Sequence, residues 1–332
     1  MAKRKAAQIT PPTVTPLAIG IDIGGTGTKY GIVDRDGNVL FSGEMSTKKH
    51  KTVETFIVEL HDVVSEAIKQ AGGIGRMKGI GVGAPNGNYY TGTIEYAPNL
   101  PWEGIIPLAK LISHKFQLPV TLTNDANAAA IGEMMYGAAK GMKDFIMITL
   151  GTGVGSGIVA NGALIYGHDG FAGELGHAVV IPGGRVHAGT GKKGSLESYA
   201  SATGVRLTAL EVLEHSKEKS LLRKVPADKL DSKAVYDAAI EGDELAKEIF
   251  NYTGKILGIA LANAVMTTSP EAIILFGGLT KSGELILKPT RDSMEENLIK
   301  VFQNKVKLLI SHLKEAHAAI LGASALVWEK ES

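Results

Sequence analysis

The sequence predicts an α/β protein of two similar lobes with a central cleft. Two observations support this prediction. The glycine- and threonine-rich turn D-I-G-G-T-G-T-K (residues 22–29) comes straight after an apolar strand and leads into another, and the turn L-G-T-G-V-G-S-G (residues 150–157) does the same. Such an internal repeat indicates two lobes of one architecture, and ligands tend to bind in the cleft between such lobes.

The first copy of the repeat begins with a meander of three strands, expected at residues 17–23, 29–33 and 38–43. A helix follows from 53 to 71, because apolar residues recur there at helical spacing, and Gly72-Gly73 ends it. A short buried strand is expected at 79–84. The order is therefore strand, strand, strand, helix, strand.

The second copy repeats this order, with strands expected at 145–150, 156–160 and 163–166. Helices follow near 198–215, 232–240 and 243–267, and a buried strand at 272–276 ends at Gly277-Gly278. A last strand (305–310) and helix (314–328) are expected to pack back onto the first lobe. The predicted domains are thus a flexible tail (1–16), a small lobe (17–123 plus 314–332) and a large lobe with an insertion (124–313).

Composition excludes several classes of protein. The chain has 332 residues, 44% of them hydrophobic, which suffices for real cores. Lysine plus arginine (35) nearly balance aspartate plus glutamate (34), so neither nucleic acid nor a membrane surface is an expected partner. Cysteine is absent, which excludes disulfides and thiolate metal sites and is compatible with the cytoplasm. No apolar segment is expected to approach the roughly 20 residues of a membrane span.

The two turns have the chemistry of phosphate-binding loops. Glycines permit positive φ and let backbone N–H groups point at an anion, and threonine hydroxyls add donors. Walker A is absent, and the second turn lacks the G-x-G-x-x-G spacing of a dinucleotide site, so two plain hairpins are the main alternative. Lys29 supplies a cation, and Asp22 could hold Mg²⁺ through water. The candidate phosphate ligands are Gly24, Gly25, Thr26, Thr28, Gly151, Thr152, Gly153 and Gly155.

Polar residues gather in four short stretches: P-N-L-P-W (98–102), T-N-D-A-N (123–127), G-E-L-G-H (173–177) and G-S-L-E (194–197). Planar Asn, Asp, Glu and His side chains suit the paired hydroxyls of a sugar. Asp125 follows an expected strand (120–123) and opens an alanine-rich helix (126–139), so a helix N-cap is the alternative role. The helix N-terminus is expected to lower its pKa, which suits an aspartate that takes a hydroxyl proton late in phosphoryl transfer.

These motifs resemble the ROK family, the bacterial sugar kinases and sugar-responsive repressors of the actin-like ATPase superfamily. The resemblance runs from about residue 17 to the C-terminus, and A-G-E-L-G-H is its most specific part. It implies an actin-like ATPase (ribonuclease H-like) fold, a sugar-binding insertion in the large lobe, and Asp125 as catalytic base. It also implies ATP phosphates at both turns, adenosine beside Phe276, Gly277 and Gly278, and sugar hydroxyls on Asn99, Asn124, Glu174, His177 and Glu197.

The chain departs from this family at one motif. The family usually carries C-x-C-G-x-x-G-C before L-E, which binds zinc together with the histidine of E-x-G-H. Ala188, Thr190 and Ser195 stand at the three cysteine positions here. Alanine cannot bind zinc and neutral hydroxyls bind it poorly, and His177 with the nearby His187 makes only two ligands. The expectation is therefore no zinc, with the loop 183–195 held by backbone and hydroxyl hydrogen bonds.

The expected function is an ATP-dependent hexokinase that needs Mg²⁺ and acts on glucose, in the cytoplasm and as a homodimer. A kinase for N-acetylmannosamine, fructose or another hexose is the alternative within enzymes. A sugar-responsive repressor is less favoured, because it needs a DNA-binding helix-turn-helix and only 16 residues precede the first strand. A sugar-binding protein without turnover is disfavoured because Asp125 and both turns are intact.

Overall fold

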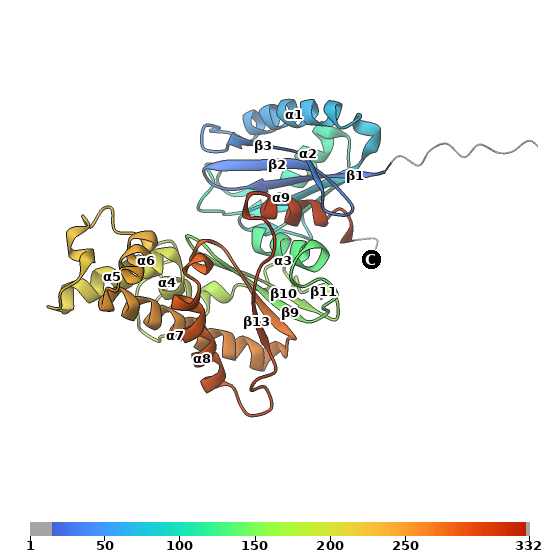
Figure 1. Ribbon diagram of the computed structural model, residues 1–332. Coiled ribbons are helices and arrows are strands. Elements are labelled where there is room, and N and C mark those ends of the chain that lie inside the picture. Colours follow the sequence, from blue (N-terminus) through green and yellow to red (C-terminus); the bar gives the residue numbers. More distant parts are fainter. Residues whose placement is uncertain (1–14, 330–332) are drawn as a thin grey trace, which may run out of the picture.

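The duplicated strand pattern folds into two five-stranded sheets of equivalent topology. Their strand orders are β3-β2-β1-β4-β8 and β11-β10-β9-β12-β13. In each sheet the first three strands in chain order form an antiparallel meander, and two later strands join in parallel. This computed structural model describes residues 15–329, and Figure 1 shows its two lobes. The predicted repeat and two-lobed α/β fold are therefore confirmed.

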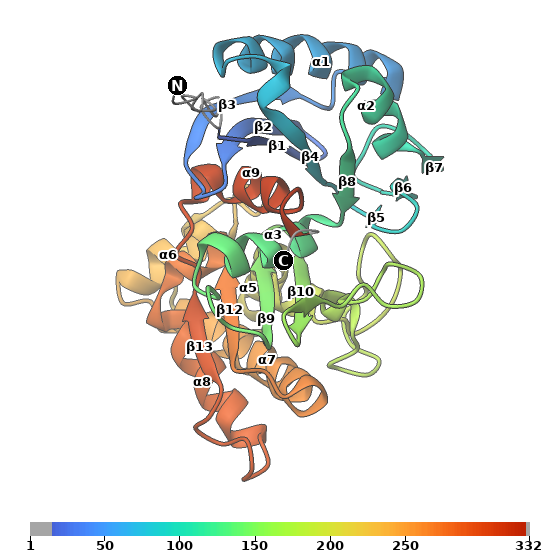
Figure 2. The same ribbon diagram turned by 90° about the vertical axis from the view of Figure 1, so that its right-hand side faces the viewer.

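The first lobe combines one sheet with two outer helices. The strands are β1 (Leu17–Ile23), β2 (Gly27–Asp34), β3 (Val39–Ser46), β4 (Met77–Gly83) and β8 (Val120–Thr123). The helices α1 (Val53–Gln70) and α2 (Leu108–Phe116) cover its outer face, where Phe56 and Leu60 pack with Ile80 in the core (Figure 2). A small sheet of β5 (Gly87–Asn88), β6 (Thr93–Glu95) and β7 (Ile105–Ile106) lies beside β8.

The second lobe contains β9 (Phe145–Leu150), β10 (Val154–Ala160), β11 (Ala163–Leu164), β12 (Ala272–Phe276) and β13 (Lys307–Ile310). Its core joins Ile146 and Leu275 of the sheet to Leu257 of a long helix. The helices of this lobe are α4 (Glu197–Ala200), α5 (Ala202–His215), α6 (Ser232–Ile240), α7 (Glu244–Thr268) and α8 (Glu284–Asn297).

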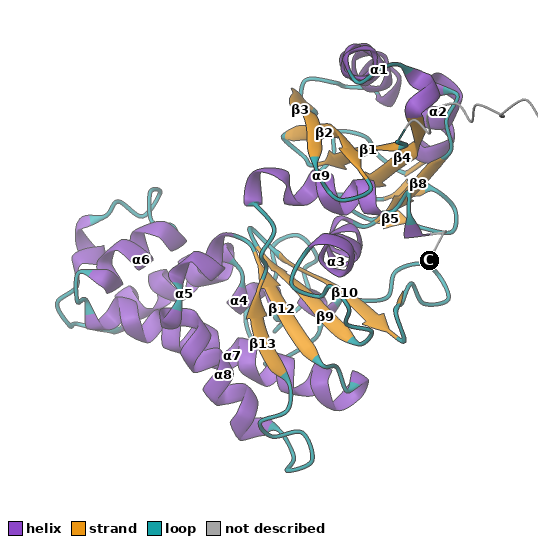
Figure 3. Ribbon diagram, turned by 45° about the vertical axis from the view of Figure 1, so that its right-hand side comes forward, coloured by secondary structure: helices purple, strands orange, loops and turns teal. Residues whose placement is uncertain are grey.

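Two further helices, α3 (Asp125–Tyr136) and α9 (Glu315–Ala325), lie between the two sheets (Figure 3). Glycines allow the close approach of these layers. A Cβ on Gly81 of β4 would lie 1.8 Å from the carbonyl oxygen of Ala323, and one on Gly132 of α3 would lie 2.8 Å from the Cα of Gly322. As expected, the last helix returns to the first sheet, but the expectation that the last strand does so is wrong, because β13 pairs in parallel with β12 in the second sheet. The exact domain boundaries stay a prediction, and the proposed tail lies, except for residues 15 and 16, outside the described residues.

One sequence expectation is wrong: a segment long and apolar enough to span a membrane does exist. Helix α7 has 25 residues and meets that criterion by length and composition, but 61% of its most apolar stretch is buried inside the protein. It packs against α5, α6 and α8, so its apolar surface is explained by its place as the central helix of the second lobe.

Candidate active site

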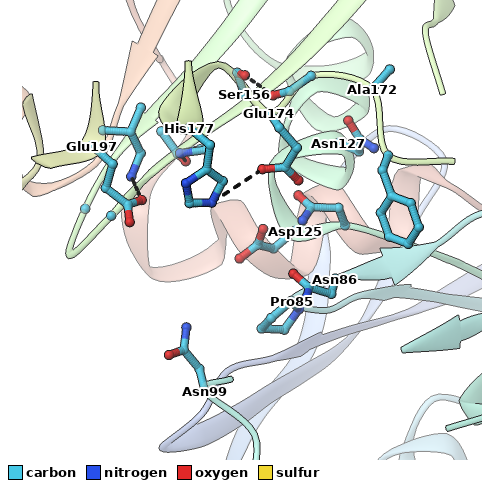
Figure 4. Close-up of a pocket in the computed structure, with 18 of the residues that line it drawn as sticks. Pro85, Asn86, Asn99, Asp125, Asn127, Ser156, Ala172, Glu174, His177 and Glu197 are labelled. Carbon is cyan, nitrogen blue, oxygen red and sulfur yellow. Dashed lines mark hydrogen bonds and ion pairs between the residues drawn. The ribbon is translucent and has the colours of Figure 1, made fainter. Parts of the chain in front are cut away.

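A cavity of 360 Å³ opens where the carboxyl ends of β4, β8 and β9 meet. Parallel strands of an α/β sheet place the residues that follow them at a common edge, which is where such folds bind ligands. Figure 4 shows Asp125 between Glu174 and His177 on one side and Asn86 and Asn99 on the other. The residues that line this cavity include the predicted Asn99, Asn124, Asp125, Gly151, Thr152, Gly153, Gly155, Glu174, His177 and Glu197.

Asp125 is the first residue of α3, and its N-cap is Asn124, whose side chain accepts from the backbone N–H of Ala126 at 2.8 Å. Asp125 itself faces the cavity. The predicted lowering of its pKa is wrong. Asp125 is exposed to the open cavity, but the protein atoms that enclose the cavity reduce its hydration and so raise the pKa of this carboxyl, and the hydrogen bond from the Ala126 N–H offsets only part of that effect. A raised pKa makes Asp125 a better proton acceptor than a carboxylate at an open helix end.

Asp22 is the penultimate residue of β1 and lies beside Asp125. Gly83 brings the two together, since a Cβ there would lie 3.5 Å from the Cα of Asp125 and 3.6 Å from Oδ1 of Asp22. Burial and, to a smaller extent, the charge of Asp125 raise the pKa of Asp22 to about 7, while Lys29, its cross-strand neighbour, acts in the opposite direction. Two neighbouring carboxyls, of which that of Asp22 is largely buried, favour a bound cation.

The first glycine turn is shorter than expected and covers only residues 24–26 between the two strands. The backbone N–H of Gly24 donates to the carbonyl of Gly27 at 3.0 Å, and Gly25 packs on the carbonyl of Asn99. Thr28 lies within β2, is fully buried, and pairs its hydroxyl with Thr47 at 2.8 Å. This side chain therefore supports the turn instead of reaching a phosphate, contrary to the prediction.

The second turn is tied to its surroundings by its own amides. The N–H of Gly151 donates to Gly153 at 3.0 Å, that of Gly155 to Thr149 Oγ1 at 3.1 Å, and that of Val154 to Glu197 at 2.6 Å. A phosphate must compete with these internal acceptors for the same amides. Gly277 packs against Leu150 at φ +112°, and Phe276 lines a second cavity of 190 Å³ with Asp125 and Thr149.

Three further predicted sugar ligands come from the large lobe. Glu174 precedes a short 3₁₀ turn and His177 is its last residue, and Nε2 of His177 lies 3.9 Å from Oε2 of Glu174. Burial raises the pKa of Glu174, partly offset by His177. Glu197 opens α4 and is more buried, with its side chain 18% exposed.

Sequence reasoning missed some residues of the cavity wall. Asn86 follows β4 in the stretch G-A-P-N, and this polar residue at the carboxyl end of a buried strand was a usable signal. Asn127 belongs to the polar stretch 123–127 but was not predicted as a ligand; it lies in the first turn of α3, where it donates to Thr123 Oγ1 at 3.3 Å. Phe171 has no comparable signal, because its loop reaches the site only through the tertiary fold.

Backbone hydrogen bonds hold part of the loop 183–195, as expected, whereas another part is held by the charged side chain of Arg185, which was not expected. Gly194 accepts from Val180 and donates to Arg185, both at 2.8 Å. Of the three positions at which thiolates were expected, Ala188 and Thr190 are exposed, and Ser195 is buried with its hydroxyl 2.8 Å from that of Ser198.

Arg185 is an anchor of this loop that the sequence did not reveal. Its guanidinium donates to both carboxylate oxygens of Glu211 on α5, at 2.8 and 2.5 Å, and to Thr208 at 3.2 Å. It also lies over the ring of Tyr199, 4.5 Å from the centroid. A charged group with this many partners fixes the loop firmly on the helices beneath it.

Two glycine turns beside an acidic pair, with a polar cavity between two duplicated lobes, define a protein of the actin-like ATPase fold in its two-lobed sugar-kinase form. The chain belongs to the ROK family, whose sequence profile matches residues 18–330. It is 36% identical to a glucokinase of Halalkalibacterium halodurans over 95% of this chain and 96% of that protein.

Two other relatives show the range of the family. The crystal structure of a ROK family glucokinase from Streptomyces griseus in complex with glucose and AMPPNP superimposes with a TM-score of 0.77 at 34% identity, covering 93% of this chain and 98% of that one. A xylose repressor of Caldicellulosiruptor bescii is 30% identical over 93% of this chain and 77% of its own length.

Proposed function

We propose that this protein is an ATP-dependent hexokinase that transfers the γ-phosphoryl group of ATP to glucose, giving glucose 6-phosphate. The observation that carries this proposal is the placement of Asp125 in the cavity wall between sugar-type side chains and the acidic residue Asp22. A protein that only binds a sugar has no need of a proton acceptor with a raised pKa at that point.

In the proposed reaction, Asp125 accepts a hydrogen bond from the hydroxyl of the hexose that attacks phosphorus. As the new O–P bond forms and the bond to the ADP oxygen breaks, the hydroxyl proton passes to Oδ of Asp125. Glu174, His177, Glu197 and Asn99 hold the remaining hydroxyls, so the attacking oxygen is oriented before transfer.

The nucleotide is proposed to bind between the glycine turns. Asp22 is proposed to hold Mg²⁺ through water. Its raised pKa shows that the charged form is disfavoured without a cation nearby, so a bound cation would stabilise that form. Mg²⁺ would neutralise charge on the phosphates, and Lys29 lies across the strand pair from Asp22 to add a second cation.

Glucose is preferred because of the relatives described as glucokinases. N-acetylmannosamine, fructose or another hexose is the alternative substrate. A coupled assay with ATP, Mg²⁺ and a panel of hexoses tests the proposal, and glucose should give the highest kcat/KM. If another hexose gives a higher kcat/KM, that hexose replaces glucose as the proposed substrate. Absence of turnover with every hexose would overturn the enzyme assignment.

The similarity to a xylose repressor keeps a regulatory role as the second candidate. Sugar binding without ATP turnover, together with sugar-dependent binding to a DNA fragment, would favour it. We also propose a cytoplasmic location and a homodimer, which cell fractionation and light scattering of the purified protein test.

A further inference from the structure

One short contact at the edge of the cavity involves a residue that the proposed reaction does not use. Nε2 of His187 lies 2.5 Å from Oε1 of Glu197, and the two side chains are only 17% and 18% exposed. Glu197 lines the cavity, whereas His187 belongs to the loop 183–195 behind it. His187 therefore acts on the cavity through Glu197.

The second ring nitrogen determines which way this hydrogen bond runs. The backbone N–H of Thr190 donates to Nδ1 of His187 at 3.1 Å, and the Thr190 hydroxyl lies 3.0 Å from the same atom. A nitrogen that accepts from an N–H carries a lone pair, so the proton of the neutral ring is on Nε2. Nε2–H thus donates to Glu197.

The turn that carries His187 is itself well fixed. The backbone N–H of His187 donates to the carbonyl of Lys192, and the N–H of Gly191 donates to the carbonyl of His187, both at 2.8 Å. The imidazole is consequently held by the backbone on one side and by a carboxylate on the other.

The other oxygen of Glu197 is held from a different direction. Oε2 accepts from the backbone N–H of Val154 at 2.6 Å, within the second glycine turn. One donor on each oxygen leaves the carboxylate a single orientation, with its remaining lone pairs toward the cavity.

We propose that His187 is a positioning residue that, backed by Thr190, orients Glu197 toward the hydroxyls of the hexose. This inference rests on the proposed function for the identity of the ligand. A carboxylate that is already oriented loses less entropy when the sugar binds. His187 should therefore increase the affinity for the sugar.

The same residues raise a metal-binding alternative, since single ligand atoms of His177, His187 and Glu197 lie within 4.8 Å of one another. The hydrogen bonds do not fit it. A metal on Nε2 would require the ring proton to move to Nδ1, where it would point at the N–H of Thr190 and repel it. In addition, a structural zinc takes four protein ligands. The arrangement fits a hydrogen-bonded support.

Two substitutions separate the roles of the ring nitrogens. His187→Gln keeps an N–H donor near the position of Nε2, whereas His187→Asn reaches only as far as Nδ1. We expect His187→Asn to raise the KM for the hexose by about tenfold, the effect of one charge-assisted hydrogen bond, with kcat changed by less than about threefold. His187→Gln should stay near wild type, as should the control His114→Asn on the exposed face of α2.

A general structural role would instead lower thermal stability and kcat together, and equal KM values for the Gln and Asn variants would overturn the proposal. About one zinc per untagged chain, lost in both variants, would show that the metal alternative is correct. Nitrogen-15 NMR of labelled histidines adds a test independent of turnover. It should show the Nε2–H form for His187 with or without chelator, and an Nδ1–H form would contradict the assignment even if no hexose proves to be a substrate.

Discussion

At the scale of single residues, burial has more effect on the site than the helix N-terminus does. Asp125 begins α3, where the helix dipole favours a negative charge, yet its pKa is raised because the protein atoms that enclose the cavity reduce its hydration, although the residue is exposed to the cavity. Asp22 experiences the same loss of hydration and, in addition, the charge of Asp125. In the proposed reaction, a hydroxyl proton would compensate this loss of hydration at Asp125 and a cation would compensate it at Asp22.

Asp125→Asn should lower kcat by at least about 10²-fold, because the amide cannot accept the hydroxyl proton. Sugar affinity and the fold should change little, since the shape of the side chain is kept. Steady-state kinetics with calorimetric sugar binding measures both. Near-normal turnover would remove Asp125 from the role of base.

Asp22 predicts a pH dependence of stability for the protein without ligand. Its pKa is 3.8 ordinarily and about 7 when folded, so between these values the folded state binds more protons than the unfolded state. The free energy of unfolding contributed by this group therefore falls as pH rises from about 4 to about 7.

Asp22→Asn should reduce this decline, so the stability of the variant relative to wild type should increase over that pH range. Urea denaturation of the two proteins at several pH values measures the difference, in which the other titrating groups largely cancel. Parallel curves would contradict the raised pKa. The variant should also bind Mg²⁺ with ATP more weakly.

At the scale of elements, glycines decide how closely the layers between the lobes approach. β1 and β4 both meet α9 at glycines, and the Cβ of an alanine at Gly20 would lie 2.2 Å from the carbonyl oxygen of Ile320. Backbone atoms cannot move aside as a flexible side chain can. Helix α9 lies far from β1 and β4 in the sequence, and it can pack closely on these strands because the glycines have no side chains at the contact.

Gly81→Ala should destabilise the protein by about 3 kcal/mol or more, because its Cβ would lie 1.8 Å from the Ala323 carbonyl oxygen. Gly75→Ala is a matched control, since a Cβ there meets nothing within 4 Å. Its effect should stay within about 0.5 kcal/mol. Thermal denaturation compares them, and equal melting temperatures would show that α9 moves to accommodate the methyl group.

At the scale of the whole molecule, the two lobes contribute different parts of one cavity. Asn86 and Asn99 follow strands of the first lobe, whereas Glu174, His177 and Glu197 belong to the second. Contacts with a sugar from both sides favour the arrangement in which the lobes are close together.

Glucose and a non-hydrolysable ATP analogue should each reduce the radius of gyration, because each ligand is proposed to contact both lobes. Small-angle scattering with and without each ligand measures this change. An unchanged radius at saturation with both ligands, checked by calorimetry, would argue against closure of the two lobes.

The repeat, the order of its elements along the chain and most element positions could be predicted from the sequence, because they depend on local periodicity and on glycines that end strands. Strand β9 and helix α6, for example, have the expected bounds. The cluster Asn99, Asp125, Glu174 and Glu197 could also be proposed, since each residue stands in a short polar stretch next to a predicted element. The hydrogen bonds, burial and pKa values of these residues depend on neighbours far away in the chain.

Only the tertiary structure decided that the pKa of Asp125 is raised, that Thr28 is buried, that Arg185 anchors its loop and that His187 contacts Glu197. Each of these depends on hydration or on a partner brought close by folding. Local sequence patterns report which backbone conformation a segment prefers. They do not report the distance between two side chains or the loss of water around a carboxyl, and these set the chemistry of the site.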